Sequence, residues 1–197
     1  MAKKQDPIEE PEVTQEEVIQ DTAEQANEEV QDEVTNEEPQ PTATIMLVDD
    51  GVAVIDGDHA LVISLHEEIC SFGCGIDSQD EETGVPSPSM DTFDGEMRTQ
   101  FLTDFYHPED GALIIAREYG WLPSGGEMKF IFDHKDAINA IIEEAGGDIM
   151  ADDDYWTSQR FSNDRMWSCN MSDGTFSIDR GCISELRVRP VKAYVEA

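Results

Sequence analysis

The aromatic residues divide this chain into two parts. Every Trp, Tyr and Phe lies beyond residue 71, whereas residues 1–43 hold 14 of the 45 acidic residues and only two of the 12 basic ones. A strongly charged segment without aromatic side chains cannot bury enough apolar surface to offset the entropy that folding removes. We therefore predict a disordered or transiently helical acidic tail over residues 1–43 and one folded domain over residues 44–197.

The domain begins with segments typical of strands and ends with more of them. Residues 44–48, 52–55 and 60–64 are apolar and are separated by Asp- and Gly-rich turns, which predicts three strands. The last third, from Asp154 to Val191, alternates short apolar segments with turn residues, which is the pattern of a β-meander. Residues 67–90 contain Gly and Pro without periodicity, which predicts a long loop.

Apolar residues recur at helical spacing between these two regions. They predict four helices: one that begins at Asp91 or Thr92, one from about Glu109 to Tyr119, one capped by Ser124 with Glu127, and one from Lys135 to Ala145. In the first helix we expect the apolar residues to pack into the core, namely Phe93, Met97, Phe101, Leu102 and Phe105.

The net charge of −33 restricts the partners of the chain. Like-charge repulsion argues against nucleic acids and anionic membrane surfaces. No apolar stretch of about 18 residues exists to span a bilayer, and no apolar stretch follows the basic start as in a secretory signal. We therefore expect synthesis in a cytoplasm, where the four cysteines, Cys70, Cys74, Cys169 and Cys182, stay free thiols.

Motifs for catalysis or cofactor binding are absent from the sequence. The four histidines lie at no metal-ligand spacing, no G-x-S-x-G motif occurs, and the Gly-rich stretches lack the lysine of a phosphate-binding loop. Asp148 and Asp152–Asp154 could supply oxygen ligands to calcium, but their spacing does not match an EF-hand loop, so a solvated acidic loop is expected. We predict a non-enzymatic protein with no cofactor and no metal.

Several motifs carry a family resemblance when they are read in order. These are Trp121-Leu122-Pro123-Ser124 with Glu127, Ala137–Ala140, Gly146-Gly147, Tyr155-Trp156-Thr157-Ser158, Trp167 with Asn170, Ser172-Asp173-Gly174 and Val188-Arg189-Pro190-Val191. In this order they resemble the Lcl C-terminal domain family, which is similar to the C-type-lectin-like fold found in bacteroidete surface proteins and phage virion proteins. The resemblance covers roughly residues 60–194.

The resemblance implies an α+β fold, a C-type-lectin-like domain with a twisted antiparallel sheet and packed helices. It also implies two roles for residues in the last two fifths of the chain. Structural roles fall to Trp121, Pro123, Tyr155, Trp156, Trp167, Arg189 and Pro190. The polar loop residues between them become the candidate ligand surface: Gln159, Arg160, Ser162, Asn163, Asp164, Arg165, Thr175, Ser177, Asp179 and Arg180.

The absent secretion signal, combined with a recognition domain of this type, favours a phage virion protein that is made in the host cytoplasm. A phage of Bacteroides-like hosts, with the crAss-like group as one candidate source, would fit. Its partners would be other virion proteins, contacted through the tail, and a host surface glycan or protein. The alternatives are a capsid or tail decoration protein without a host ligand, and a bacterial cytoplasmic protein-binding module. The oligomeric state stays open.

Overall fold

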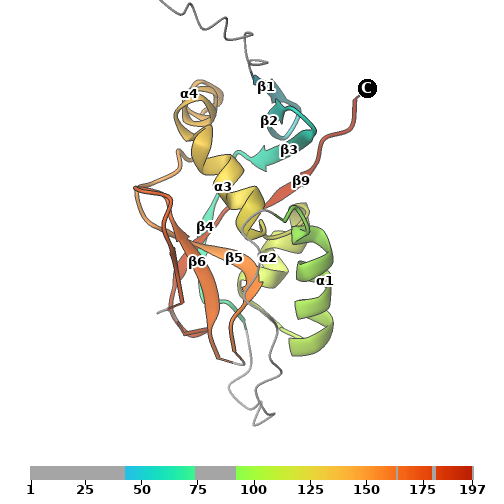
Figure 1. The fold of residues 1–197 in the computed structure, drawn as a ribbon, viewed down its shortest axis with the longest axis vertical. Coiled ribbons are helices and arrows are strands. Elements are labelled where there is room, and N and C mark those ends of the chain that lie inside the picture. The colour runs from blue at the N-terminus through green and yellow to red at the C-terminus, as the bar shows by residue number, and fades with distance from the viewer. Residues whose placement is uncertain (1–42, 74–91, 163, 179–180, 197) are drawn as a thin grey trace, which may run out of the picture. The chain divides into compact units, whose positions relative to one another are not determined.

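The computed structural model describes residues 43–73, 92–162, 164–178 and 181–196. All of them belong to one compact unit that spans Pro39–Ala197. Nearly all of the predicted tail and most of the predicted loop at 67–90 lie outside these residues. The described residues form two β-sheets and four helices (Figure 1), so the chain has a mixed α+β fold.

The first sheet has four strands in the order β1-β2-β3-β9. β1 (Thr44–Val48), β2 (Gly51–Asp56) and β3 (His59–Ser64) form an antiparallel series, which confirms the three predicted strands. Gly57 has φ of 56° in the turn between β2 and β3, a conformation that favours glycine. β9 (Val191–Ala193) pairs with β3 and brings the C-terminal region beside the start of the domain.

The second sheet has five strands in the order β4-β8-β5-β6-β7. Its strands are β4 (Glu68–Cys70), β5 (Asp154–Arg160), β6 (Met166–Asn170), β7 (Phe176–Ser177) and β8 (Leu186–Val188). The prediction of a simple meander is wrong, because β8 pairs in parallel with β5 and β9 belongs to the other sheet. The loop predicted from residue 67 is also wrong at β4, whose three residues are too few to reveal alternation.

All four predicted helices are present, with α1 at Gly95–Tyr106, α2 at Ala112–Tyr119, α3 at Gly125–Asp133 and α4 at Lys135–Ala145. α3 begins with the predicted capping box, in which the Ser124 hydroxyl accepts from the Glu127 N–H and the Glu127 carboxylate accepts from the Ser124 N–H at 2.7 Å. α4 packs on β1 and β2, α1 and α3 pack on β5, and α2 packs on β8 and β9.

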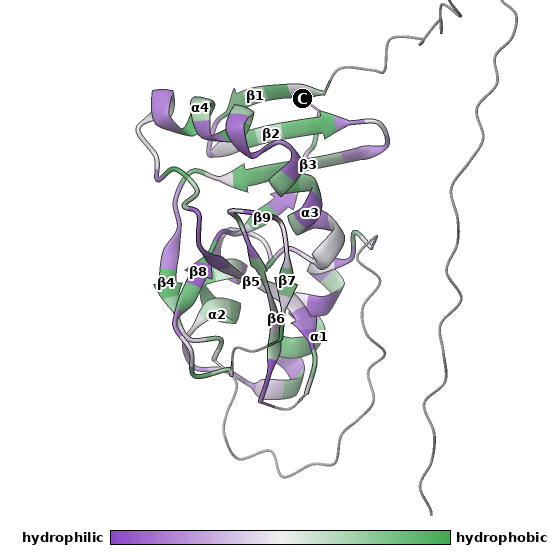
Figure 2. Ribbon diagram, turned by 60° about the vertical axis from the view of Figure 1, so that its left-hand side comes forward, coloured by the Kyte–Doolittle hydropathy of each residue, from purple (hydrophilic) through white to green (hydrophobic). Residues whose placement is uncertain are grey.

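The hydrophobic residues form two buried clusters. One joins the inner face of the four-stranded sheet to α3 and α4 and includes Val54, Ile63, Ile131 and Ile142. The other joins α1 and α2 to the five-stranded sheet around Trp156. Figure 2 shows the green apolar strands of the first sheet on one side of the second sheet and its helices. The C-terminal third of the chain contributes to both clusters and thereby holds the two sheets together.

The buried face of α1 differs from the predicted one. Leu102 is buried as expected, but Met97, Phe101 and Phe105 are exposed, so their assignment to the core is wrong. The face that α1 buries instead contains Gly95, Thr99 and Thr103. The Thr99 hydroxyl accepts from the Leu122 N–H at 3.0 Å, and the Thr103 hydroxyl donates to the Thr99 carbonyl at 2.7 Å. Satisfied hydroxyls can be buried at little cost, and hydrophobic periodicity alone does not detect them.

Candidate functional site

The β5–β6 hairpin carries most of the predicted ligand residues. Its strands pair at Asp154↔Asn170, Tyr155↔Cys169, Trp156↔Ser168 and Arg160↔Met166, with a register shift between Trp156 and Arg160. Three residues of β5 therefore face one of β6, an irregularity that re-aims side chains in many binding sites. The loop that follows β5, residues 161–165, is closed by hydrogen bonds from the Phe161 and Ser162 N–H groups to the Arg165 carbonyl, at 3.0 and 3.1 Å.

Gln159 does not present its side chain to solvent. It is fully buried, and among the described residues neither its amide oxygen nor its amide nitrogen has a hydrogen-bond partner. The Ser158 hydroxyl and the Trp167 indole N–H, in the same hairpin, also lack partners in this part of the chain. The expectation of an exposed Gln159 is therefore wrong. Buried polar atoms without partners are uncommon in folded proteins and cost about 1–3 kcal/mol each, so their concentration in one hairpin marks it as a functional candidate.

Arg160 is likewise buried, with 5% of its surface exposed. Its guanidinium carbon lies 4.6 Å from the centre of the Phe105 ring and 5.8 Å from that of Tyr106, and its Nε donates to the Ser162 carbonyl at 3.1 Å. These cation–π contacts fix the loop after β5 to the C-terminal end of α1. Burial raises the pKa of Tyr106, and the positive charge of Arg160 opposes that rise. Arg160 is thus a support of the surface rather than a free ligand group.

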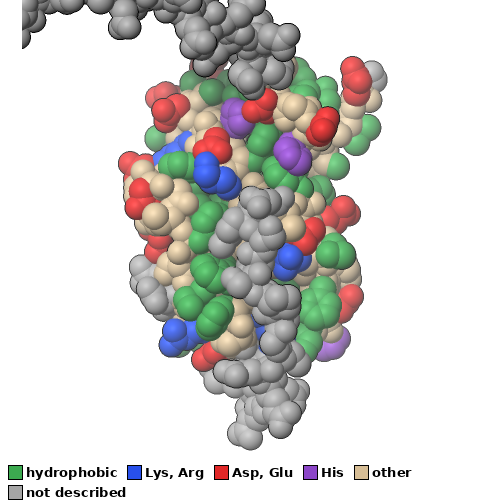
Figure 3. Space-filling model, viewed as in Figure 1, with side chains coloured by type: hydrophobic (Ala, Val, Ile, Leu, Met, Phe, Trp, Pro, Cys, Tyr) green, Lys and Arg blue, Asp and Glu red, His purple; other side chains and the backbone are tan. Residues whose placement is uncertain are grey.

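An exposed apolar stripe runs along α1 beside this loop. It consists of Met97, Phe101 and Phe105, whose side chains are 66%, 54% and 36% exposed. The rings of Phe101 and Phe105 stack with centres 6.1 Å apart. Figure 3 shows exposed hydrophobic side chains over α1. The sequence prediction missed this stripe because it assigned the same residues to the core. Their spacing of four residues was the available signal, since it places all three side chains on one side of the helix.

The remaining residues of the loop are polar and accessible. Ser162 is partly exposed and donates to the Asp164 carboxylate at 2.7 Å, while Asp164 and Arg165 are exposed. Phe161 is 46% exposed and contacts the Trp167 ring edge-on, with centres 6.2 Å apart. Asn163 lies outside the described residues. We call the α1 stripe together with Arg160, Ser162, Asp164 and Arg165 the α1–loop surface.

Two of the other predicted ligand residues, Thr175 and Ser177, lie away from the α1–loop surface. Thr175 is exposed in the turn after β6, where its N–H and hydroxyl donate to Asp173 at 2.9 and 2.7 Å. The length of β6 separates this turn from the loop at 161–165. Ser177 lies on β7, the edge strand of the sheet, and pairs with Ser168. The structure therefore does not bring Thr175 and Ser177 into one surface with the loop at 161–165. Asp179 and Arg180 lie outside the described residues.

Six of the seven predicted structural residues are buried. Trp121 donates to the Glu127 carboxylate, the Pro123 carbonyl accepts from the Ser158 N–H at 2.8 Å, and Trp156 Nε1 donates to the Cys70 carbonyl at 3.0 Å. These three contacts connect the start of α3, β5 and β4. Trp167 is partly exposed.

Arg189 lies at the centre of a buried polar network between the sheets. Its guanidinium donates to the Ser64 carbonyl at 2.9 Å, to the Glu67 carboxylate at 2.6 Å and to the Asp148 carbonyl. Tyr155 donates to the same Glu67 carboxylate at 2.7 Å. Burial raises the pKa of the Tyr155 hydroxyl, and the nearby Glu67 carboxylate raises it further. Pro190 follows, and its carbonyl accepts from the Ser64 N–H at 3.0 Å.

The acidic residues considered for calcium each have a different partner. Asp148 contacts His66 at 3.1 Å, Asp153 contacts Arg187 at 3.0 Å, and Asp154 accepts from Asn170 at 2.9 Å. Within the part of the chain that the structure describes, no group of three His, Cys, Asp or Glu side chains is placed to hold a metal ion. The hydrogen bond from His66 lowers the pKa of Asp148.

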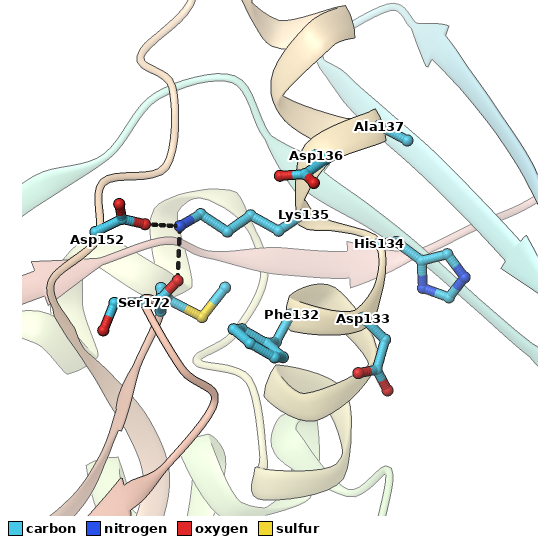
Figure 4. Close-up of a pocket in the computed structure, with 9 residues that line it drawn as sticks. Phe132, Asp133, His134, Lys135, Asp136, Ala137, Asp152 and Ser172 are labelled. Carbon is cyan, nitrogen blue, oxygen red and sulfur yellow. Dashed lines mark hydrogen bonds and ion pairs between the residues drawn. The ribbon is translucent and has the colours of Figure 1, made fainter.

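Asp152 lines a hollow of about 440 Å³ between the start of α4 and the turn after β6 (Figure 4). Lys135 extends across it, pairs with Asp152 and donates to the Met171 carbonyl at 2.6 Å. His134 contacts Asp56 at 3.2 Å and the Phe130 carbonyl at 2.8 Å. Lys135 and His134, the basic groups of the hollow, already have protein partners. The hollow is therefore a weaker candidate for a ligand site than the hairpin.

The cysteines differ from the expectation of free thiols in one respect. Cys70 and Cys169 are free, and burial raises their pKa values to about 11 and about 12, which keeps both thiols protonated at neutral pH. Cys182 is disulfide-bonded, so the expectation is wrong for this residue. Cys74 lies outside the described residues. Because Cys169 is a free thiol, it is not the disulfide partner of Cys182.

None of the described helices is long and apolar enough to cross a bilayer. No model of a known protein family and no curated protein matches the sequence. The structure is similar to part of a fimbrial protein from Bacteroides ovatus ATCC 8483, with a TM-score of 0.55 and 14% sequence identity. The match covers 69% of this chain but 36% of the fimbrial protein, so it is a likeness of fold.

Proposed function

We propose that the chain is a non-enzymatic binding module of a bacteriophage virion and that it contacts its partner through the α1–loop surface. The observation that carries the proposal is the contact of Arg160 with Phe105, which joins an exposed aromatic stripe to a polar loop. Exposed aromatic side chains beside arginine and small polar groups are the composition of energetically important binding surfaces.

We further propose that the domain is a divergent C-type-lectin-like domain of the Lcl C-terminal type. The ordered motifs from Trp121 to Val191 support this assignment, because most of their aromatic side chains and Arg189 are buried. A scaffold of this kind leaves the connecting loops free for recognition. The partner we favour is a host surface glycan or protein: sugar rings stack on aromatic faces, and Arg165 and Asp164 supply charged hydrogen-bonding groups.

A second function, assembly or decoration without a host ligand, is supported by the fold. The structure of similar fold belongs to a fimbrial protein. In that case the α1–loop surface would contact other structural proteins of the particle. Two results together would favour this function: the protein is detected in purified particles, and particles that lack it still bind the host.

The test measures binding of the full chain to Bacteroides-like cells and to their purified capsular polysaccharide. We expect Phe101→Ser and Arg165→Ala each to weaken binding at least about tenfold, as hot-spot side chains do, without change in melting temperature. The matched control is Ile149→Ser, which removes an apolar side chain that is 54% exposed, as Phe101 is, in the segment after α4. Binding that is absent, or that Ile149→Ser weakens as much as Phe101→Ser, would contradict a host-binding role for this surface.

A further inference from the structure

The outer face of the four-stranded sheet is apolar: Ala53 and Val62 are buried there, and Met46 and Val48 of β1 are partly exposed. Register places Met46, Ala53, Val62 and Lys192 in one row across β1, β2, β3 and β9. The opposite face, with Val54 and Ile63, packs into the core. An antiparallel sheet with one solvated face ordinarily alternates apolar and polar residues, and these strands do not. Their sequence is that of a sheet covered on both sides.

A hollow of about 540 Å³ lies on this outer face. Apolar side chains of Met46, Val48 and Val62 line it from the sheet, and Tyr194 and Val195 line it from the segment after β9. Val195 is 80% exposed. The hollow is therefore a mostly apolar depression on the outer face of the sheet.

β1 also has an unpaired edge. In the described ranges it pairs with β2 and with no strand on its other side. Proteins usually protect such edges with lysine, proline or a bulge, because unpaired backbone groups attract another strand. The sequence Thr-Ile-Met-Leu-Val of β1 has no such protection, and Leu47 is 54% exposed.

Charge at the end of the hollow indicates the kind of partner. Asp50 pairs with Lys192, whose ammonium also lies 4.8 Å from the centre of the Tyr119 ring. Asp49 is exposed and has no ion pair among the described residues. The chain as a whole carries a net charge of −33, so a second copy would be repelled, whereas a basic segment would be attracted.

We propose that β1 receives an extended segment of a partner protein that carries alternating apolar and basic residues. The segment would add a fifth strand to the sheet through backbone hydrogen bonds to β1. Its apolar side chains on one face would enter the hollow beside Met46 and Val48, and a basic side chain would pair with Asp49. This surface is separate from the α1–loop surface and does not depend on the function proposed for it.

The test uses the full chain, labelled with ¹⁵N, and a synthetic heptapeptide in which lysine and valine alternate. We expect this peptide to slow amide hydrogen exchange of Thr44–Val48 by about tenfold or more. A peptide with glutamate in place of lysine should have no effect. Met46→Lys should abolish the protection, whereas Ile183→Lys, the matched exposed control, should retain it. If Met46→Lys fails to fold, Val195→Lys alters the hollow without touching the core.

Four outcomes would overturn the proposal. The lysine peptide could leave exchange of the β1 amides unchanged, or Met46→Lys and Val195→Lys could both bind it as the unmodified chain does. The β1 amides could be protected before any peptide is added and lose that protection when residues 1–38 are removed, which would assign the edge to the chain itself. If the β1 amides are protected without peptide and this protection disappears on dilution, the edge of β1 pairs with a second copy of the chain.

Discussion

Gln159 has the least favourable environment of the residues at the candidate site. Its amide is fully buried and has no partner among the residues that the structure describes, so the folded state bears the cost of removing two donors and an acceptor from water. Replacing the amide by an apolar group of similar size removes that cost. A binding site often retains such a cost because the polar group serves the ligand, which the free protein does not contain.

We therefore predict that Gln159→Leu increases the free energy of unfolding by about 1–3 kcal/mol. Urea denaturation of the full chain, followed by tryptophan fluorescence, measures it. The matched control is Gln100→Leu, since Gln100 is exposed and donates to Asp104 at 2.9 Å; it should not stabilise the protein. A loss of stability in Gln159→Leu would mean that the Gln159 amide is satisfied, for example by water.

A site residue was predictable when neighbours in the sequence determine its exposure, and it was not predictable when distant residues cover it. Composition identified the loop around Ser162–Arg165, because polar residues between strand segments indicate turns. The burial of Gln159 and Arg160 could not be predicted in this way, since Phe105 and Tyr106, which cover Arg160, lie more than 50 residues earlier in the sequence.

Among the elements, those with local signals were predicted and those without were not. The helices and β1–β3 follow from periodicity and from caps such as Ser124 with Glu127. β4, β7, β8 and β9 have two or three residues each, and their partners are set by tertiary packing. The parallel pairing of β8 with β5 has no counterpart in local sequence, which is why the meander was expected instead.

The capping box of α3 places a carboxylate in the interior. Glu127 is 2% exposed and accepts from the Ser124 N–H at 2.7 Å and from Trp121 Nε1 at 3.2 Å. Burial raises its pKa, and these hydrogen bonds reduce the rise without cancelling it. The folded state therefore holds the proton of Glu127 more tightly than the unfolded state does. Its contribution to stability is fully present below about pH 4.5, near the unfolded pKa, and is lost as pH rises through the folded pKa.

It follows that Glu127→Gln should become more stable relative to the unmodified protein as pH rises from about 4.5 to 7.5. The amide can still accept from Ser124 and Trp121, so the cap persists in the variant. Free energies of unfolding at several pH values measure the difference. The matched control is Glu143→Gln at an exposed position of α4, which removes one carboxylate but leaves the cap intact. Parallel pH profiles for Glu127→Gln and the unmodified protein would refute the prediction.

The two sheets of the molecule are joined by the network around Arg189. Its guanidinium contacts the end of β3 at Ser64, the segment before β4 at Glu67 and the segment after α4 at Asp148. Glu67 also pairs with Arg187 and accepts from Tyr155. A buried carboxylate needs its guanidinium partners in a medium of low dielectric constant, and the loss of Arg189 leaves Glu67 with the more exposed Arg187 as its counterion.

Arg189→Ala should consequently lower the free energy of unfolding by about 3–5 kcal/mol, the usual effect of breaking a buried ion pair. The matched control is Arg165→Ala, because Arg165 is exposed on the loop and its removal should change stability by less than about 0.5 kcal/mol. The double variant Arg189→Ala with Glu67→Gln separates the pair from the packing, since the second substitution removes the stranded charge and should restore part of the loss. Equal losses in Arg189→Ala and Arg165→Ala would mean that the network does not hold the sheets together.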